Sequence, residues 1–125
     1  MHTCRRRQPR YRLGPNSRAV LEFRFPEGEN GQDLRLVVAD LSASGLGFIL
    51  DGSMPGMDLG TGIKGATLCY GERRIAMDLL VLHVTQDFAA DAICGCLVYP
   101  ASDTDLRGFK DLLAEMAGEH ASVTS

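Results

Sequence analysis

Residues 36–50 read LVVADLSASGLGFIL, two apolar runs joined by a short polar segment. Apolar runs of this length, bounded by turn-forming residues, are typical of strands. The segment Asp40-Leu41-Ser42-Ala43-Ser44-Gly45 is rich in the residue types that favour tight turns. We therefore expect two neighbouring strands with a tight polar connection, and a carboxylate, that of Asp40, held in the turn.

Further strands are indicated on both sides of this stretch. Residues 18–25 alternate apolar and polar side chains with a period of two. A hairpin turn is expected at Gly71-Glu72, between two later apolar segments. Six strands are expected in all, at residues 18–25, 34–40, 45–50, 63–70, 73–85 and 92–99. Several short strands at this spacing are typical of a small barrel or a sandwich.

The end of the chain changes to a helical period. One apolar stripe is formed by Leu106, Phe109, Leu112, Leu113 and Met116. Residues 102–105, SDTD, predict an N-cap with acids in the first turn, and Gly118 predicts a stop. We expect an amphipathic helix over residues 103–119 whose stripe covers an open side of the barrel. Binding of a partner along the stripe is the alternative.

The length of 125 residues predicts a single domain. We divide it into an Arg-rich mobile segment at residues 1–17, a folded body at 18–120 and a frayed tail at 121–125. The longest aliphatic run, residues 79–82, is far too short to span a bilayer, and no signal-peptide pattern begins the chain. A cytoplasmic location is therefore expected.

Positive charge is concentrated near the N-terminus. Residues 1–21 contain six Arg and no acidic residue, whereas the remainder carries 7 basic and 16 acidic groups. A domain that coats nucleic acid would be basic over a broad face. Of the 13 cations 11 are Arg, whose planar fork binds phosphate or a guanine edge with two hydrogen bonds. This distribution suits a small anionic ligand better than a nucleic acid.

The cysteines offer a metal site as one interpretation. Cys94 and Cys96 flank Gly95 in an expected strand, so their side chains share a face, and His83 would be a further ligand. The chain has no CxxC pair and no His spacing of the zinc type. We favour buried reduced thiols, since free Cys behaves as a small hydrophobic residue. We expect no metal, and His83 is then an ordinary strand residue.

The chemistry of guanine connects Asp40 with the Arg-rich segment. Guanine presents N1–H and N2–H2 donors on one edge and O6 and N7 acceptors on another. A carboxylate can accept from both donors, and an Arg fork can donate to both acceptors. Ser42 adds a hydroxyl, and Gly45 permits a positive φ and a close approach of the main chain to a flat base. The alternatives are an Asp/Ser turn that only closes a hairpin and an Arg tail that is only solvated.

The order Arg6-x-x-x-Arg10 followed by Asp40-x-Ser42-x-x-Gly45 resembles the paired signature of PilZ domains, bacterial receptors for cyclic di-GMP. The resemblance covers essentially the whole chain and implies a stand-alone PilZ domain. The fold it implies is mainly β, a six-stranded antiparallel β-barrel with a C-terminal α-helix. The ligand it implies is cyclic di-GMP, with no cofactor.

The resemblance also implies a role for each motif residue. Arg6 and Arg10 would close over the nucleotide and bind guanine edges and phosphates. Asp40 and Ser42 would hold a guanine, and Gly45 would keep the turn open.

The neighbouring Arg5 and Arg7 are expected helpers, and the number of nucleotides bound stays open. The expected function is binding without catalysis, since nothing suggests a nucleophile and a base held together. Ligand contacts would order the Arg-rich segment and offset its lost entropy, and an unidentified protein partner would read the change. The alternatives are a small barrel that binds RNA or DNA and a protein-interaction module that does not respond to cyclic di-GMP.

Overall fold

The structure, a computed structural model, describes residues 11–13, 18–25, 29, 31–50, 59–86 and 92–124, with side chains up to residue 118 except those of 85 and 86. The elements in these ranges are β1 (Tyr11–Arg12), β2 (Ala19–Phe25), β3 (Gln32–Leu41), β4 (Gly45–Leu50), β5 (Gly62–Tyr70), β6 (Arg73–Gln86), β7 (Ala92–Pro100) and α1 (Asp103–Thr124). All six expected strands are present, and β1 is additional.

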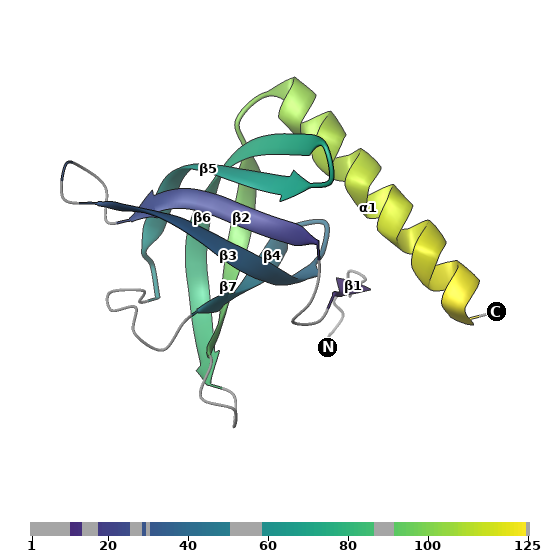
Figure 1. Ribbon diagram of the computed structural model, residues 1–125, viewed down its shortest axis with the longest axis horizontal. Coiled ribbons are helices and arrows are strands. Elements are labelled where there is room, and N and C mark those ends of the chain that lie inside the picture. Colours follow the sequence, from purple (N-terminus) through teal and green to yellow (C-terminus); the bar gives the residue numbers. More distant parts are fainter. Residues whose placement is uncertain are drawn as a thin grey trace, which may run out of the picture.

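Strands β2 to β7 form a closed antiparallel barrel (Figure 1). The hydrogen-bonded order is β3-β2-β5-β6-β7-β4, and β4 pairs back onto β3 to close the sheet. Closure removes the open edges that a small sheet would otherwise present. The predicted six-stranded antiparallel barrel with a C-terminal helix is confirmed.

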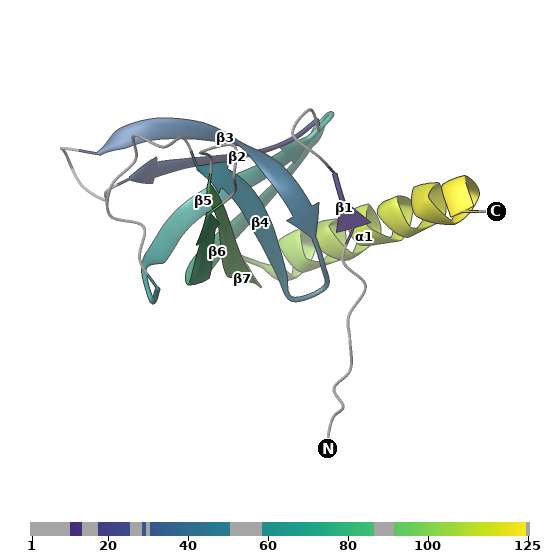
Figure 2. The ribbon, with the colours of Figure 1, turned by 90° about the horizontal axis from the view of Figure 1, so that it is seen from below.

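The short strand β1 lies beside the C-terminal end of β3, close to α1 (Figure 2). Strand β2 pairs with β3 only up to Val37, and β1 pairs with β3 beyond that point. Tyr11 and Arg12 belong to the segment at residues 1–17 that was expected to be mobile, and they pair with β3 as strand β1. Backbone pairing holds Tyr11 and Arg12, and the N–H of Leu13 donates to the carbonyl of Ala39 at 2.7 Å.

The core fills the barrel with the inward-facing side chains of each strand. Phe48 is fully buried, and its ring centroid lies 5.6 Å from that of Phe23 on β2. Side chains of α1 join the same cluster, so barrel and helix share one core.

The helix starts at an N-cap serine, Ser102. The N–H of Asp105 donates to Ser102 Oγ at 3.1 Å, and the Asp105 carboxylate accepts hydrogen bonds from Ser102 Oγ at 2.6 Å and from the N–H of Ala76 on β6 at 2.9 Å. The predicted N-terminus is confirmed. The predicted stop is wrong, since α1 continues through Gly118 to Thr124 and includes most of the expected tail. Gly118 does not take the left-handed conformation that ends a helix.

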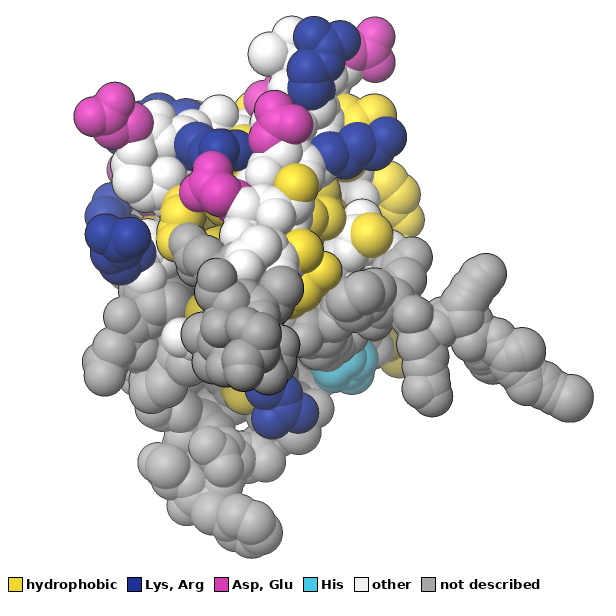
Figure 3. Space-filling model, turned by 90° about the vertical axis from the view of Figure 1, so that its right-hand side faces the viewer, with side chains coloured by type: hydrophobic (Ala, Val, Ile, Leu, Met, Phe, Trp, Pro, Cys, Tyr) yellow, Lys and Arg dark blue, Asp and Glu magenta, His cyan; other side chains and the backbone are white. Residues whose placement is uncertain are grey.

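The predicted apolar stripe packs on the chain's own barrel. Phe109, Leu112 and Met116 are buried, and α1 contacts β6, β7 and β1. On the face that carries α1, the described basic and acidic side chains are interspersed (Figure 3). Within the described residues, no helix combines the length and the apolarity needed to cross a bilayer.

Candidate functional site

The polar connection after Leu41 is a two-residue hairpin turn. The N–H of Ser42 donates to the carbonyl of Gly45 at 2.8 Å, the N–H of Gly45 donates back at 3.4 Å, and the tip residues 43 and 44 are exposed. The predicted tight connection is confirmed. Asp40, the last residue of the expected strand and the first of the expected polar connection, lies within β3, where pairing continues through the buried Leu41.

Asp40 has a ladder partner on each side, Arg12 in β1 and Gly47 in β4. Directly opposite residues of an antiparallel pair carry their side chains on the same face. A Cβ on Gly47 would lie 3.0 Å from Asp40 Oδ2 and 3.1 Å from Oδ1, so the carboxylate lies over the bare backbone of β4.

A β-bulge turns Asp40 to this outer face. Val38 is fully buried in the core, and the register shifts between Val38 and Asp40. Without the extra residue, two positions spaced by two would point the same way. Bulges re-aim side chains in this manner and are frequent next to functional sites.

A positive φ was one expected reason for a glycine at position 45, but the structure shows a different one. Positive φ occurs at Gly60, Gly65 and Gly71 and not at Gly45. A Cβ on Gly45 would instead lie 2.3 Å from the carbonyl oxygen of Cys96, so any side chain would collide with the backbone of β7. The glycine therefore permits close packing of β4 on β7.

Ser42 is only 5% exposed, and its hydroxyl donates to the carbonyl of Gly45 at 3.4 Å. The hydroxyl thus stabilises the turn and keeps lone pairs that can accept further hydrogen bonds. The hairpin brings together three of the predicted site residues, Asp40, Ser42 and Gly45. Their contact with a ligand stays a prediction.

The remaining predicted site residues, Arg5, Arg6, Arg7 and Arg10, lie outside the described residues. The described chain begins directly after Arg10, at Tyr11, which pairs with Leu41 at the base of the hairpin.

Arg12 is a further candidate for the site. From the sequence it was counted among the Arg residues near the N-terminus but was given no role in binding. It is exposed and stands opposite Asp40 on the same face. Residues two apart in an extended segment share a face, so the spacing of Arg10 and Arg12 was a signal that could have found it.

His83 and the two neighbouring cysteines lie on opposite faces of the sheet. Cys94 and Cys96 both point into the core with their sulfur atoms 3.9 Å apart, which confirms their shared face. Their mutual hydrogen bond and burial raise the pKa of Cys96. The ring of His83 lies outside, over Gly95, where a Cβ would meet His83 Cε1 at 2.4 Å.

The metal interpretation required His83 and the two cysteines to converge, and their opposite faces prevent this. Within the described residues, no group of three or more His, Cys, Asp or Glu side chains is arranged to hold a metal ion.

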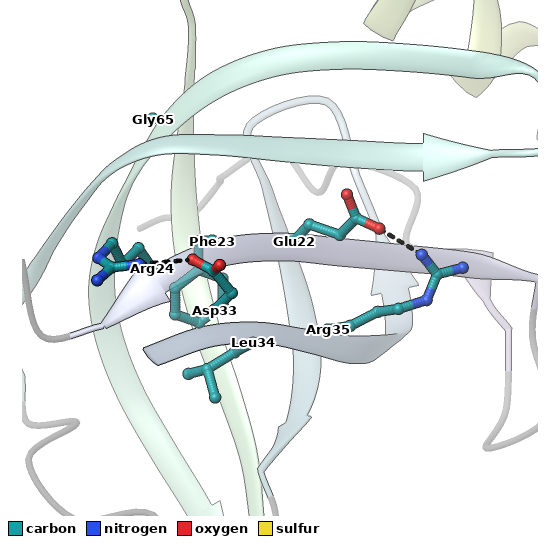
Figure 4. A pocket seen from close by; sticks show the side chains of 7 residues that line it. All are labelled: Glu22, Phe23, Arg24, Asp33, Leu34, Arg35 and Gly65. Carbon is teal, nitrogen blue, oxygen red and sulfur yellow. Dashed lines mark hydrogen bonds and ion pairs between the residues drawn. The ribbon is translucent and has the colours of Figure 1, made fainter. Parts of the chain in front are cut away.

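A surface depression of about 470 Å³ lies elsewhere, over β2, β3 and Gly65 of β5 (Figure 4). Two ion pairs cross it, Arg24 with Asp33 at 3.0 Å and Arg35 with Glu22. The two partners on β3, Asp33 and Arg35, lie in the first part of that strand, away from Asp40 near its end. The charges that line the depression therefore neutralise one another across the β2–β3 ladder.

No protein-family model and no curated protein sequence matches the chain. Solved structures do match. The K. pneumonia MrkH–c-di-GMP complex is 22% identical with a TM-score of 0.80, over 96% of this chain and 56% of that one. The c-di-GMP-bound PilZ domain of YcgR from Escherichia coli is 17% identical with a TM-score of 0.70, over 97% and 98%. The Bacillus subtilis inhibitor of motility MotI/DgrA is 16% identical with a TM-score of 0.64, over 93% and 53%.

The chain therefore has the fold of a PilZ domain, as the motif resemblance predicted. It spans about half the length of MrkH and of MotI/DgrA and nearly all of the separate YcgR domain.

Proposed function

We propose that the chain is a receptor for cyclic di-GMP that binds the nucleotide on the outer face of the barrel, where β1, β3 and the hairpin at residues 42–45 meet. One observation carries the proposal: ladder pairing sets β1, which begins directly after Arg10, beside Asp40. The ligand is suggested by the motif and by the MrkH and YcgR structures, which share the fold and contain c-di-GMP.

Asp40 is the group that reads guanine in this proposal. Its carboxylate accepts from the N1–H and N2–H2 groups, a pattern that adenine does not offer. Gly47 beneath it carries no side chain, which leaves the space in which the Asp40 carboxylate lies over β4. Ser42 and Gly45 keep the hairpin closed at the end of the strand that carries Asp40.

In this proposal the Arg side chains supply the positive charge that binds the phosphates and the acceptor edge of guanine. The Cα atom of Arg10 is about 3.8 Å from that of Tyr11, and each further residue adds at most about 3.6 Å. Covalent linkage thus keeps Arg10, and four residues beyond it Arg6, within reach of a ligand at Asp40. Their forks bind guanine O6 and N7 or the phosphates, with Arg5, Arg7 and Arg12 as further cations.

Signalling follows from ordering of the segment before β1. Ligand contacts offset the entropy that residues 1–10 lose, and a protein partner reads the ordered segment or the surface around it. The protein acts in the cytoplasm by binding alone, without catalysis.

Calorimetric titration with cyclic di-GMP tests this function, with cyclic di-AMP and a single-stranded DNA oligonucleotide as comparison ligands. We expect saturable binding of cyclic di-GMP and little binding of cyclic di-AMP, because adenine lacks the donors that Asp40 requires. Preferred binding of the oligonucleotide with a steep salt dependence would instead identify a nucleic-acid-binding barrel.

A further inference from the structure

We propose that Cys94 and Cys96 are a redox-sensitive thiol pair, which a peroxide converts into an intrachain disulfide that distorts β7 at Gly95 and weakens binding of the nucleotide. Both side chains point into the core, away from the outer face on which the nucleotide is proposed to bind. Formation of the bond is a property of the barrel alone, whereas its effect on the nucleotide rests on the proposed function.

The two thiols lie next to each other inside the barrel. Cys94 is fully buried, Cys96 is 4% exposed, and their sulfur atoms are 3.9 Å apart. Neither is part of a disulfide in the structure. When one thiol of such a pair is oxidised, the second is already in place to react with it, which a single buried cysteine cannot offer.

The hydrogen bond between the thiols gives them different roles. Cys96 donates to the sulfur of Cys94, which lowers the pKa of Cys94 and raises that of Cys96. Cys94 is therefore the nucleophile. Its thiolate attacks one oxygen of hydrogen peroxide and breaks the O–O bond, giving a sulfenic acid and a hydroxide that takes up the thiol proton to form water. The Cys96 thiol then attacks the Cys94 sulfur, the S–S bond forms, and the sulfenic oxygen leaves as a second water.

A defect in the neighbouring ladder provides a route for a small oxidant. Strand β6 has a bulge between Val81, which pairs with Cys96, and His83, which pairs with Gly95. The residue between them, Leu82, is 40% exposed. A bulge disrupts the ladder locally, and local opening is easier where backbone pairing is interrupted. A peroxide can therefore reach the pair without unfolding of the whole barrel.

The disulfide does not fit a regular strand. Residues two apart in an antiparallel strand have Cα atoms about 6.8 Å apart, whereas disulfides typically join Cα atoms about 5.5–6 Å apart. The strand must shorten between the two cysteines, and Gly95 between them is the residue that changes its backbone conformation most freely. Gly95 pairs with Gly47 on β4, and Gly47 pairs with Asp40 on β3. A distortion at Gly95 thus reaches the carboxylate of the proposed site through two ladder steps.

Mass spectrometry of the folded chain after exposure to hydrogen peroxide tests the bond. A background with Cys4→Ala and Cys69→Ala lacks the other two cysteines, so an intrachain disulfide can only join Cys94 to Cys96. We expect a mass lower by two hydrogen atoms, restored by dithiothreitol. Cys96→Ala in the same background is the control, because a single thiol cannot form a bond within one chain. Peptide mapping of the unmodified chain locates the same bond independently of these variants.

Calorimetric titration of the reduced and oxidised forms with cyclic di-GMP tests the regulation. We expect the oxidised form to bind at least about 10-fold more weakly, because a strained disulfide stores several times the free energy that this factor represents. Reduction should restore the affinity. The Cys96→Ala control should bind equally well before and after the same treatment with peroxide.

The possible failures are distinguishable. A folded chain that keeps both thiols under peroxide, or forms the bond only in denaturant, would overturn the proposal. Equal affinity of the reduced and oxidised forms would overturn the regulation. Absence of any binding by the reduced protein would overturn the proposed function and the regulation together, whereas the mass measurement decides on the disulfide by itself.

Discussion

Gly45 packs against Cys96 so closely that a Cβ on the glycine would stand 2.3 Å from the carbonyl oxygen of its neighbour. The obstacle is backbone of β7, which cannot rotate away as a flexible side chain could. A residue expected from a ligand-binding motif thus has a structural role of its own in closing the barrel.

Replacing Gly45 by Ala should therefore destabilise the fold before any effect on binding is considered. We expect a loss of about 1–3 kcal/mol in the free energy of unfolding, the usual cost of forcing an extra methyl group into a packed site. Denaturant unfolding measures it. Gly62→Ala in β5 is the matched control, because nothing lies within 4 Å of its Cβ position. Equal stability of the two variants would contradict the packing role.

The helix should contribute to the stability of the barrel through its buried stripe. Leu112 is fully buried, so Leu112→Ala should lower the free energy of unfolding by about 2–5 kcal/mol. Leu106 on the same helix is 39% exposed, and Leu106→Ala should cost clearly less. If thermal unfolding shows the same loss for both, the helix does not pack as described.

The capping carboxylate of Asp105 should make stability depend on pH. Hydrogen bonds from the Ser102 hydroxyl and from the N–H of Ala76 lower the pKa of Asp105 below its ordinary value of 3.8. A carboxyl whose pKa is lower in the folded state stabilises the fold fully above its unfolded pKa, and the gain is lost as pH falls through the folded pKa.

Asp105→Asn should therefore be less stable than the parent at neutral pH, and its stability should fall less on acidification from about pH 5 to about pH 2. Unfolding curves across that range measure the difference. Asp103→Asn removes a charge from the same helical turn and is the control. A parallel loss of stability in the parent and Asp105→Asn would show that the capping bonds contribute nothing.

Arg10 should matter to binding far more than a guanidinium elsewhere on the chain. Loss of one bidentate contact costs about 1–3 kcal/mol, so Arg10→Ala should bind cyclic di-GMP about 5- to 150-fold more weakly. Arg107→Ala removes the same charge from an exposed position on α1 and should bind normally. Similar weakening by both variants would indicate a general effect of net charge.

The fold was predictable because its main signals are local. The alternation in β2, the hairpin at Gly71 and the N-cap at Ser102 each depend on nearby residues, and each is present in the structure. Strand β1 was missed because two residues carry no periodicity, and only pairing with β3 reveals it. The helix passed its expected stop because an exposed Gly costs a helix only about 1 kcal/mol.

For the proposed site, the sequence supplies candidate residues but not their arrangement. Asp40 and Ser42 could be named from the motif, but the bulge after Val38 that turns Asp40 outward leaves no local signal. Likewise, the reason for Gly45 is a contact with Cys96, some fifty residues away in the chain.

The most direct test of the central claim is calorimetric titration of the purified chain with cyclic di-GMP, performed side by side with Asp40→Ala. We expect saturable binding by the unmodified protein and an affinity about 5- to 150-fold lower for the variant, with both proteins unfolding alike. An unmodified protein that shows no binding at tens of micromolar ligand, or an Asp40→Ala variant that binds as tightly as its parent, would contradict the account.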